Sequence, residues 1–185
     1  MTTDTGLIRS RRAQLVLALV VILALAVVLF VVGSDGGDQA GAGELEGEPP
    51  PSFTFEYFDG GTGSLADFAG KPVVLNFWAS WCPACVAEMP DFQAVHEELG
   101  DEVVFLGMDM QDISREAALS LVESTGVDYI LADDPTGEIF QAFGGFSMPT
   151  TVFINSSGGI VGTHNGSIYA EDLTARINEL LLPNG

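Results

Sequence analysis

The apolar positions of the chain fall into three successive stretches. From residue 13 to residue 32, twenty residues include only one polar side chain, that of Gln14. A helix of this length rises about 30 Å, which matches the hydrocarbon core of a bilayer. Residues 33–52 are rich in Gly, Glu, Asp and Pro and hold one large apolar residue, so they cannot bury a core. From residue 53 on, apolar runs alternate with polar turns, which is typical of one folded domain.

The spacing of apolar side chains beyond residue 53 predicts alternating strands and helices. Unbroken or alternating apolar runs are typical of strands. Strands are expected at 53–57, 73–79, 103–108, 129–131, 150–154 and 159–163. Apolar positions three and four residues apart are typical of helices, which are expected at 83–99, 114–125, 137–143 and 170–182, with a short helical turn at 64–68. This order predicts an α/β domain with a central mixed sheet and helices on both faces.

The charges around the first apolar stretch predict its orientation. Arg9, Arg11 and Arg12 precede it, and the next basic residue is Lys71, so the positive-inside rule leaves the N-terminus in the cytoplasm. A cleaved signal peptide is the alternative, but its apolar region is usually only about 7–15 residues and ends at a small-residue cleavage site. We predict a cytoplasmic N-terminus at 1–12, a single transmembrane anchor at 13–32, a flexible acidic linker at 33–52 and an extracytoplasmic domain at 53–185.

The chain is strongly acidic, with 26 Asp and Glu against 6 Lys and Arg and a net charge of −20. Such a surface excludes nucleic acid as a partner, because binding to the phosphate backbone needs basic side chains. It also excludes docking by charge onto an anionic membrane face. The acidity is consistent with a solubility adaptation or with attraction of basic client proteins.

The chain has two cysteines, Cys82 and Cys85, at the junction of a predicted strand and a predicted helix. A Cys-x-x-Cys motif in this position is typical of a dithiol/disulfide redox site. Cys82 stands at the start of the helix, where free backbone N–H groups and the helix dipole stabilise a thiolate, and Pro83 suits the first helical turn. Cys85 lies almost one turn later and should be more buried. We therefore predict Cys82 as the attacking nucleophile and Cys85 as the resolving thiol.

Other uses of this cysteine pair fit the sequence less well. A four-thiolate zinc site needs two more cysteines, and c-type haem attachment needs a histidine where the chain has Val86. A permanent structural disulfide stays possible outside the cytoplasm, but a loop this short gives little chain-entropy stabilisation. The sequence therefore predicts no metal and no bound cofactor, only a redox-active Cys82–Cys85 disulfide.

Two segments resemble one known family. The run Asn76 to Cys85 with its following Glu88-Met89-Pro90 resembles the active-site segment of membrane-anchored thioredoxin-like proteins of the TlpA/ResA type. The segment Met148 to Thr151 resembles the cis-proline loop that the thioredoxin fold places opposite the cysteines. The resemblance implies a thioredoxin fold with an inserted helix-plus-strand element at about 114–131 and a cis Pro149. It also implies that clients bind at Trp81, Pro83, Met148 and Pro149.

Glu88 is a further candidate for a catalytic residue. It follows Cys85 by three residues and so points to nearly the same helix face. A partly buried carboxyl there would have a raised pKa and could relay a proton to or from Cys85, a role that the family resemblance also implies. The alternative is a surface glutamate favoured by the helix dipole. Asn76 stands where thioredoxin proper has a buried aspartate, and an amide cannot exchange a proton at physiological pH.

The resemblance implies an extracytoplasmic protein thiol-disulfide oxidoreductase that reduces client disulfides. It suggests apocytochrome c as a client, in cytochrome c maturation, and a membrane electron donor of the CcdA/DsbD kind. Three alternatives remain open on the residues. They are an oxidant that installs disulfides, a thiol peroxidase, and a client-binding module whose redox chemistry is incidental.

Overall fold

The computed structural model describes residues 47–182, and the predicted anchor at 13–32 lies outside them. Within the described part, no helix is both long and apolar enough to cross a bilayer. The strands are β1 (Phe55–Tyr57), β2 (Thr62–Gly63), β3 (Val73–Trp78), β4 (Val104–Met110), β5 (Ile130–Asp134), β6 (Thr150–Ile154) and β7 (Ile160–Asn165). The helices are η1 (Leu65–Phe68), α2 (Pro83–Leu99), α3 (Arg115–Thr125), α4 (Glu138–Ala142) and α5 (Ala170–Leu180).

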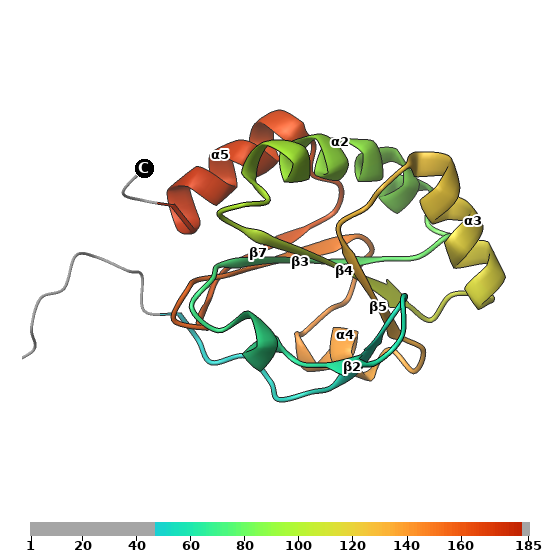
Figure 1. Cartoon of the computed structure of the whole chain (residues 1–185), viewed down its shortest axis with the longest axis horizontal. Coiled ribbons are helices and arrows are strands. Elements are labelled where there is room, and N and C mark those ends of the chain that lie inside the picture. Colours follow the sequence, from blue (N-terminus) through green and yellow to red (C-terminus); the bar gives the residue numbers. More distant parts are fainter. Residues whose placement is uncertain (1–46, 183–185) are drawn as a thin grey trace, which may run out of the picture. The chain divides into compact units, whose positions relative to one another are not determined.

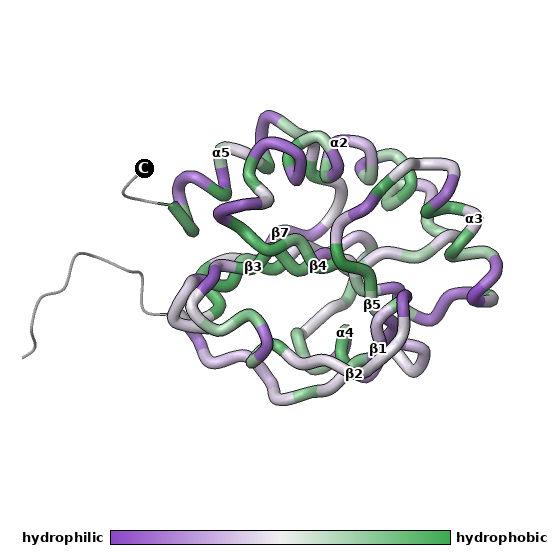
Figure 2. The backbone as a smooth tube through the Cα atoms, in the orientation of Figure 1, coloured by the Kyte–Doolittle hydropathy of each residue, from purple (hydrophilic) through white to green (hydrophobic). Residues whose placement is uncertain are grey.

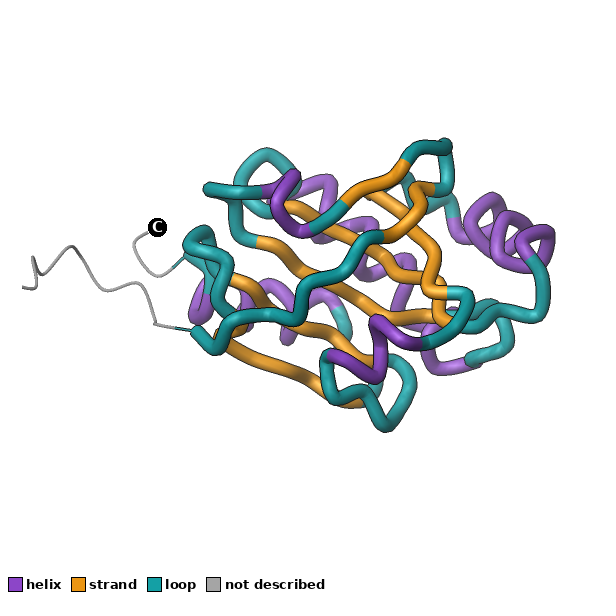
Figure 3. Tube along the Cα trace, turned by 90° about the horizontal axis from the view of Figure 1, so that it is seen from below, coloured by secondary structure: helices purple, strands orange, loops and turns teal. Residues whose placement is uncertain are grey.

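The seven strands form one mixed sheet in the order β2-β1-β5-β4-β3-β6-β7. β3 pairs in parallel with β4 and antiparallel with β6, and β4 pairs in parallel with β5. Figure 1 shows α5, α2 and α3 along one face of this sheet and α4 on the other. Seen from below, the strands cross one another at an angle, as expected of a twisted sheet (Figure 3). The predicted mixed sheet with helices on both faces is confirmed.

The central strand β3 is buried along its whole length, and its alternate side chains enter two cores. Val74 and Trp78 pack in the core under α2, α3 and α5, together with both cysteines. Leu75 and Phe77 pack in the core on the α4 side. Figure 2 shows the apolar residues of β3 and β4 between the two helical layers. This alternation follows from the two-residue period of a strand, and it turns Asn76 toward α2.

Several element boundaries agree with the sequence pattern. Helix α2 spans the predicted residues 83–99. Helix α3 begins after Ser114, whose hydroxyl accepts a hydrogen bond from the Ala117 N–H, and ends at Gly126 with φ of +71°. Glycine adopts this left-handed conformation more readily than other residues do, which explains why the helix ends at this position.

Other boundaries were wrong: β1 begins at Phe55 and not at residue 53, β2 was not predicted, β7 ends at Asn165 and not at 163, and α5 ends at Leu180 and not at 182. The differences in β4 and β5 have a common cause. β5 runs to Asp134 rather than ending at Leu131, and β4 runs to Met110 rather than Met108. Both extensions lie where β4 and β5 pair with each other, up to the register pair Met110 and Asp134. Backbone pairing with a neighbouring strand therefore extends β5 through Ala132-Asp133-Asp134, a segment with low intrinsic strand propensity.

Candidate active site

The two cysteines form a disulfide at the N-terminus of α2. Cys82 is the N-cap residue, and its sulfur accepts a hydrogen bond of 3.2 Å from the Cys85 N–H. Pro83 occupies the first turn, as predicted. Cys82 is 5% exposed and Cys85 is completely buried. Of the two sulfurs, the one at the helix start is thus nearer to solvent, which fits attack by Cys82 and resolution by Cys85.

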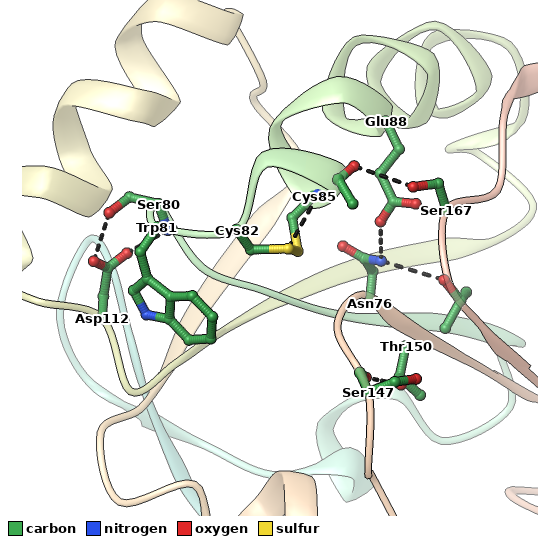
Figure 4. The surroundings of a disulfide bond; sticks show 12 residues. Asn76, Ser80, Trp81, Cys82, Cys85, Glu88, Asp112, Ser147, Thr150 and Ser167 are labelled. Atoms are coloured by element: carbon green, nitrogen blue, oxygen red, sulfur yellow. Dashed lines mark hydrogen bonds between the residues drawn. A yellow bond between two sulfur atoms is a disulfide. The ribbon is translucent and has the colours of Figure 1, made fainter.

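The peptide bond between Met148 and Pro149 is cis, which confirms the predicted isomer. It leads into β6, the antiparallel neighbour of β3. The Thr150 hydroxyl donates to the Ser147 carbonyl over 2.7 Å and fixes the entry into the strand. Figure 4 shows Ser147 and Thr150 below Asn76, on the side away from α2. Met148 packs against the core cluster that contains both cysteines.

Glu88 is completely buried behind the disulfide, so the alternative of a surface glutamate is wrong. Its Oε1 accepts a hydrogen bond of 2.9 Å from Asn76 Nδ2, and its Oε2 accepts one of 2.9 Å from the Ile168 N–H. Burial raises the pKa of Glu88 to about 7, although these two donors act in the opposite direction and Asp91 adds a smaller increase. A carboxyl with this pKa is half protonated near neutral pH, as a proton relay requires.

The loop 111–113 holds the segment in front of Cys82. Asp112 accepts two hydrogen bonds of 2.6 Å from Ser80, one from its N–H and one from its hydroxyl. The Trp81 indole N–H donates to the Gln111 carbonyl over 3.1 Å, and the indole stays 44% exposed. Figure 4 shows Asp112, Ser80 and Trp81 on one side of the disulfide and Glu88 with Asn76 on the other. The disulfide is therefore held between two sets of polar contacts.

A second buried carboxyl, that of Asp109, lies behind this loop at the end of β4. Asp109 is 4% exposed, and it lines the same cavity as Asp112. Desolvation raises the pKa of Asp109 to about 8, with further increases from Asp112 and Asp133 and a decrease from Arg115. Sequence reasoning missed both Asp109 and Asp112. The available signal was their place at and just after the end of β4, which runs parallel to β3, the strand that leads to the cysteines.

Trp78 and His96 lie near the cysteines in sequence but have structural surroundings. Trp78 packs in the same core as the cysteines. His96 approaches Asp128 at 3.7 Å and makes a T-shaped contact with the ring of Phe105, which fits a structural role. Among residues 47–182, no group of three or more His, Cys, Asp or Glu side chains could hold a metal ion.

Comparison with known proteins agrees with this site. Residues 45–180 match the model of the Redoxin family. The chain is 31% identical to the thiol-disulfide oxidoreductase ResA of Bacillus thuringiensis, over 72% of this chain and 78% of that protein. It is 28% identical to the thiol:disulfide interchange protein DsbE of Xylella fastidiosa, over 87% of this chain and 82% of the relative.

Solved structures give the same result. A DsbF homologue from Corynebacterium diphtheriae superposes with a TM-score of 0.67 at 32% identity, over 80% of this chain and 96% of that one. The fold, the disulfide at the helix start and these relatives together show a thiol-disulfide oxidoreductase of the thioredoxin fold. The chain belongs to the Redoxin family and, within it, to the ResA-like thiol-disulfide oxidoreductases.

Proposed function

We propose that the protein is anchored by residues 13–32 and reduces the disulfides of client proteins outside the cytoplasm. The Cys82 thiolate attacks one sulfur of a client disulfide, which forms a mixed disulfide and releases one client thiolate. The Cys85 thiolate then attacks the Cys82 sulfur and releases the second client thiol. Two electrons pass to the client, and the Cys82–Cys85 disulfide remains to be reduced again.

The observation that carries this proposal is the buried Glu88 carboxyl behind the disulfide. Cys85 is completely buried and must lose its proton before it can resolve the mixed disulfide. Glu88 lies one helical turn further along α2 and has a pKa of about 7. We assign it the uptake of the Cys85 proton, either directly or through one intervening group, and the return of that proton during re-reduction.

The charges near the cysteines favour reduction over oxidation. A strongly oxidising dithiol is one whose reduced form is stabilised, as a cation beside the thiolate would do. In residues 47–182, the two ion pairs link His96 to Asp128 and Arg115 to Asp133, so neither supplies a cation to the sulfurs. The ionisable group behind Cys85 is instead a carboxyl, whose negative form opposes a thiolate.

The relatives suggest the setting of this activity. Proteins named ResA and DsbE match the chain, and the family resemblance points to apocytochrome c as the client and to a membrane donor of the CcdA/DsbD kind. Trp81, Pro83, Met148 and Pro149 would form the client contact. Trp81 and Met148 retain exposed surface beside the sulfurs, which suits the binding of an extended segment.

The reduction potential of the full chain, equilibrated with redox buffers, tests the direction of electron flow. We expect a value near that of thioredoxin, about −270 mV or lower. A value near that of DsbA, about −120 mV, would make the protein a disulfide-forming oxidant and would reject the proposal.

A second experiment tests the client. The reduced full chain is mixed with an oxidised peptide that carries Cys-x-x-Cys-His, and with a control peptide in which the disulfide closes a long loop. We expect faster reduction of the first peptide. Equal rates would argue against an apocytochrome client while leaving the reductase activity standing.

Fractionation of cells that express the chain with and without residues 13–32 tests the anchor separately.

A further inference from the structure

The redox chemistry described above leaves Asp109 and Asp112 without a role. Asp112 accepts hydrogen bonds from the Ser80 N–H, the Ser80 hydroxyl and the Ile113 N–H, each over 2.6 Å. Both oxygens of Asp112 are therefore occupied by donors from its own loop and from Ser80. Asp112 also lines the same cavity as Asp109, so the two carboxyl groups lie close together, beside the segment that carries Cys82.

Asp109 has the environment of a neutral acid. It is 4% exposed, and its Oδ1 has no hydrogen-bond partner, which would be costly for a carboxylate. The groups that face it are mostly acidic. Asp112 approaches from the loop after β4, Asp133 from β5, and Arg115 from α3 is the one cation, but it pairs with Asp133.

Further acids surround the pair. The cavity beside Asp109 has a volume of about 600 Å³ and is also lined by Glu56, Asp134 and Glu138. A proton on Asp109 can be donated to Asp112, whereas an unprotonated Asp109 would oppose a second carboxylate in a buried place. The approach of Asp109 to Asp112 is therefore stable only while Asp109 carries the proton.

The contacts of the loop connect this proton to the active site. Asp112 is bound to Ser80, and the neighbouring Gln111 carbonyl accepts from the Trp81 indole. Gln111 itself has φ of +50°, an unfavourable conformation for a non-glycine residue, and its side chain donates to the Thr136 carbonyl over 3.0 Å. A backbone held in this way relaxes once its contacts are lost.

We propose that Asp109 and Asp112 share one proton that fixes the Ser80-Trp81-Cys82 segment, and that loss of this proton releases the segment. Asp109 is thus a positioning residue that acts through Asp112 and Ser80, and it makes the exposure of Cys82 sensitive to alkaline pH. The inference is independent of the client and of the direction of electron flow. It assigns the protein a pH-dependent control of its nucleophile that is separate from the proton relay of Glu88.

The test uses the full chain in its disulfide form, because neither cysteine titrates there. The fluorescence of Trp81 is followed from pH 6 to pH 10 in a W78F background, in which Trp81 is the remaining tryptophan. We expect a transition with a midpoint near pH 8, and we expect D109N to abolish it, since the amide donates to Asp112 without titrating. E88Q is the matched control and should keep the transition. A transition that persists in D109N, or its absence from the W78F parent, would overturn the proposal.

A direct measurement guards against a variant that fails to fold. Carbon-13 NMR of the Asp109 carboxyl in the unaltered chain should show it titrating above pH 7. In D112N the facing carboxylate is gone, so the same carboxyl should titrate at lower pH. Titration below pH 6 in the unaltered chain, or an unchanged midpoint in D112N, would reject a shared proton.

Discussion

Glu88 and Asp109 are both buried carboxyls near the disulfide, but their neighbours differ in charge. Glu88 accepts hydrogen bonds from two neutral donors, the Asn76 amide and the Ile168 N–H. Asp109 faces the carboxylates of Asp112 and Asp133, and one of its oxygens has no partner. Figure 4 shows the Glu88 contacts on one side of the disulfide and the Asp112 contacts on the other.

One fold thus gives two buried acids different protonation behaviour. Desolvation is the largest cause of the raised pKa at both sites. Neutral donors limit the increase at Glu88, so this pKa is about 7 and the group can exchange a proton at neutral pH. Acidic neighbours add to the increase at Asp109, so this pKa is about 8 and the group keeps its proton there. The first environment suits proton transfer, and the second suits a structural hydrogen bond.

The largest expected effect comes from removing the thiol through which Glu88 is proposed to act. C85S should lose multiple turnover completely and accumulate a mixed disulfide between Cys82 and the client, because the second exchange step has no attacking thiol. Non-reducing electrophoresis and mass spectrometry detect the trapped species.

The same background separates the two carboxyls. In C85S, adding E88Q should leave the pH profile of Cys82 alkylation unchanged, whereas adding D109N should alter its alkaline limb. If E88Q shifted the profile as much as D109N does, the assignment of the two acids to different cysteines would be wrong.

The next effect is a pH dependence of stability. The pKa of Glu88 is about 7 in the folded chain and near its ordinary value of 4.5 in the unfolded chain, so the folded state binds more protons between these values. The stability it contributes is therefore present below pH 4.5 and is lost as pH rises through 7. One pKa unit corresponds to about 1.4 kcal/mol, so the loss is about 3 kcal/mol by pH 9.

Urea unfolding of the full chain at pH 5, 7 and 9 measures this loss, with E88Q as the comparison. In E88Q, the free energy of unfolding should fall less between pH 5 and pH 7 than it does in the parent chain. In D109N, it should fall less in the range that extends through pH 8. Identical pH dependence in the parent chain and in E88Q would show that Glu88 does not change its protonation in this range.

The two sides of the disulfide also differ in how far the sequence could predict them. Cys85 and Glu88 lie three residues apart in α2, so helical periodicity alone places them on nearly the same face. Pro149 is distant in sequence, and only its resemblance to a known loop indicated a cis bond. Asn76 and Glu88 could be suspected as partners, because both lie in the same motif.

Asp109 and Asp112 could not be predicted in the same way. Their importance depends on the register that sets Asp109 opposite Trp78 in the β3–β4 pair and opposite Asp133 in the β4–β5 pair. Register is a property of the assembled sheet, not of a local run of residues. In loop 111–113, the one indication in the sequence was an Asp that follows a strand. Such residues are also common after strands that lie far from any active site.

A smaller effect is expected from making the Glu88 side resemble the Asp109 side. N76D replaces the amide donor with a second buried carboxyl that faces Glu88. The two carboxyls should then share one proton, and the pKa of Glu88 should rise above its present value. We expect a loss of about 2 kcal/mol at pH 7 from the lost donor, measured by urea unfolding, and a shifted Glu88 titration by NMR.

T151V is the matched control for this change. It removes the acceptor of the 3.2 Å hydrogen bond from Asn76 but leaves the Asn76–Glu88 contact in place. T151V should therefore leave the Glu88 titration close to that of the parent chain. An equal shift in both variants would mean that general loosening of the core, and not the charge of the facing group, sets the Glu88 pKa.

The smallest effect should come from S114A, which tests whether the Asp112 side responds to any local damage. Ser114 caps α3 two residues after Asp112, and its hydroxyl accepts the Ala117 N–H over 3.2 Å. Loss of an N-cap costs about 1 kcal/mol, and a hydroxyl does not titrate, so the loss should be equal at pH 6 and pH 9. The alkaline transition of Trp81 should keep its midpoint in S114A. If the midpoint of the Trp81 transition moved in S114A, the transition would be due to fraying of α3. Titration of Asp109 would then not explain it, and the two carboxyls would not differ in the way described above.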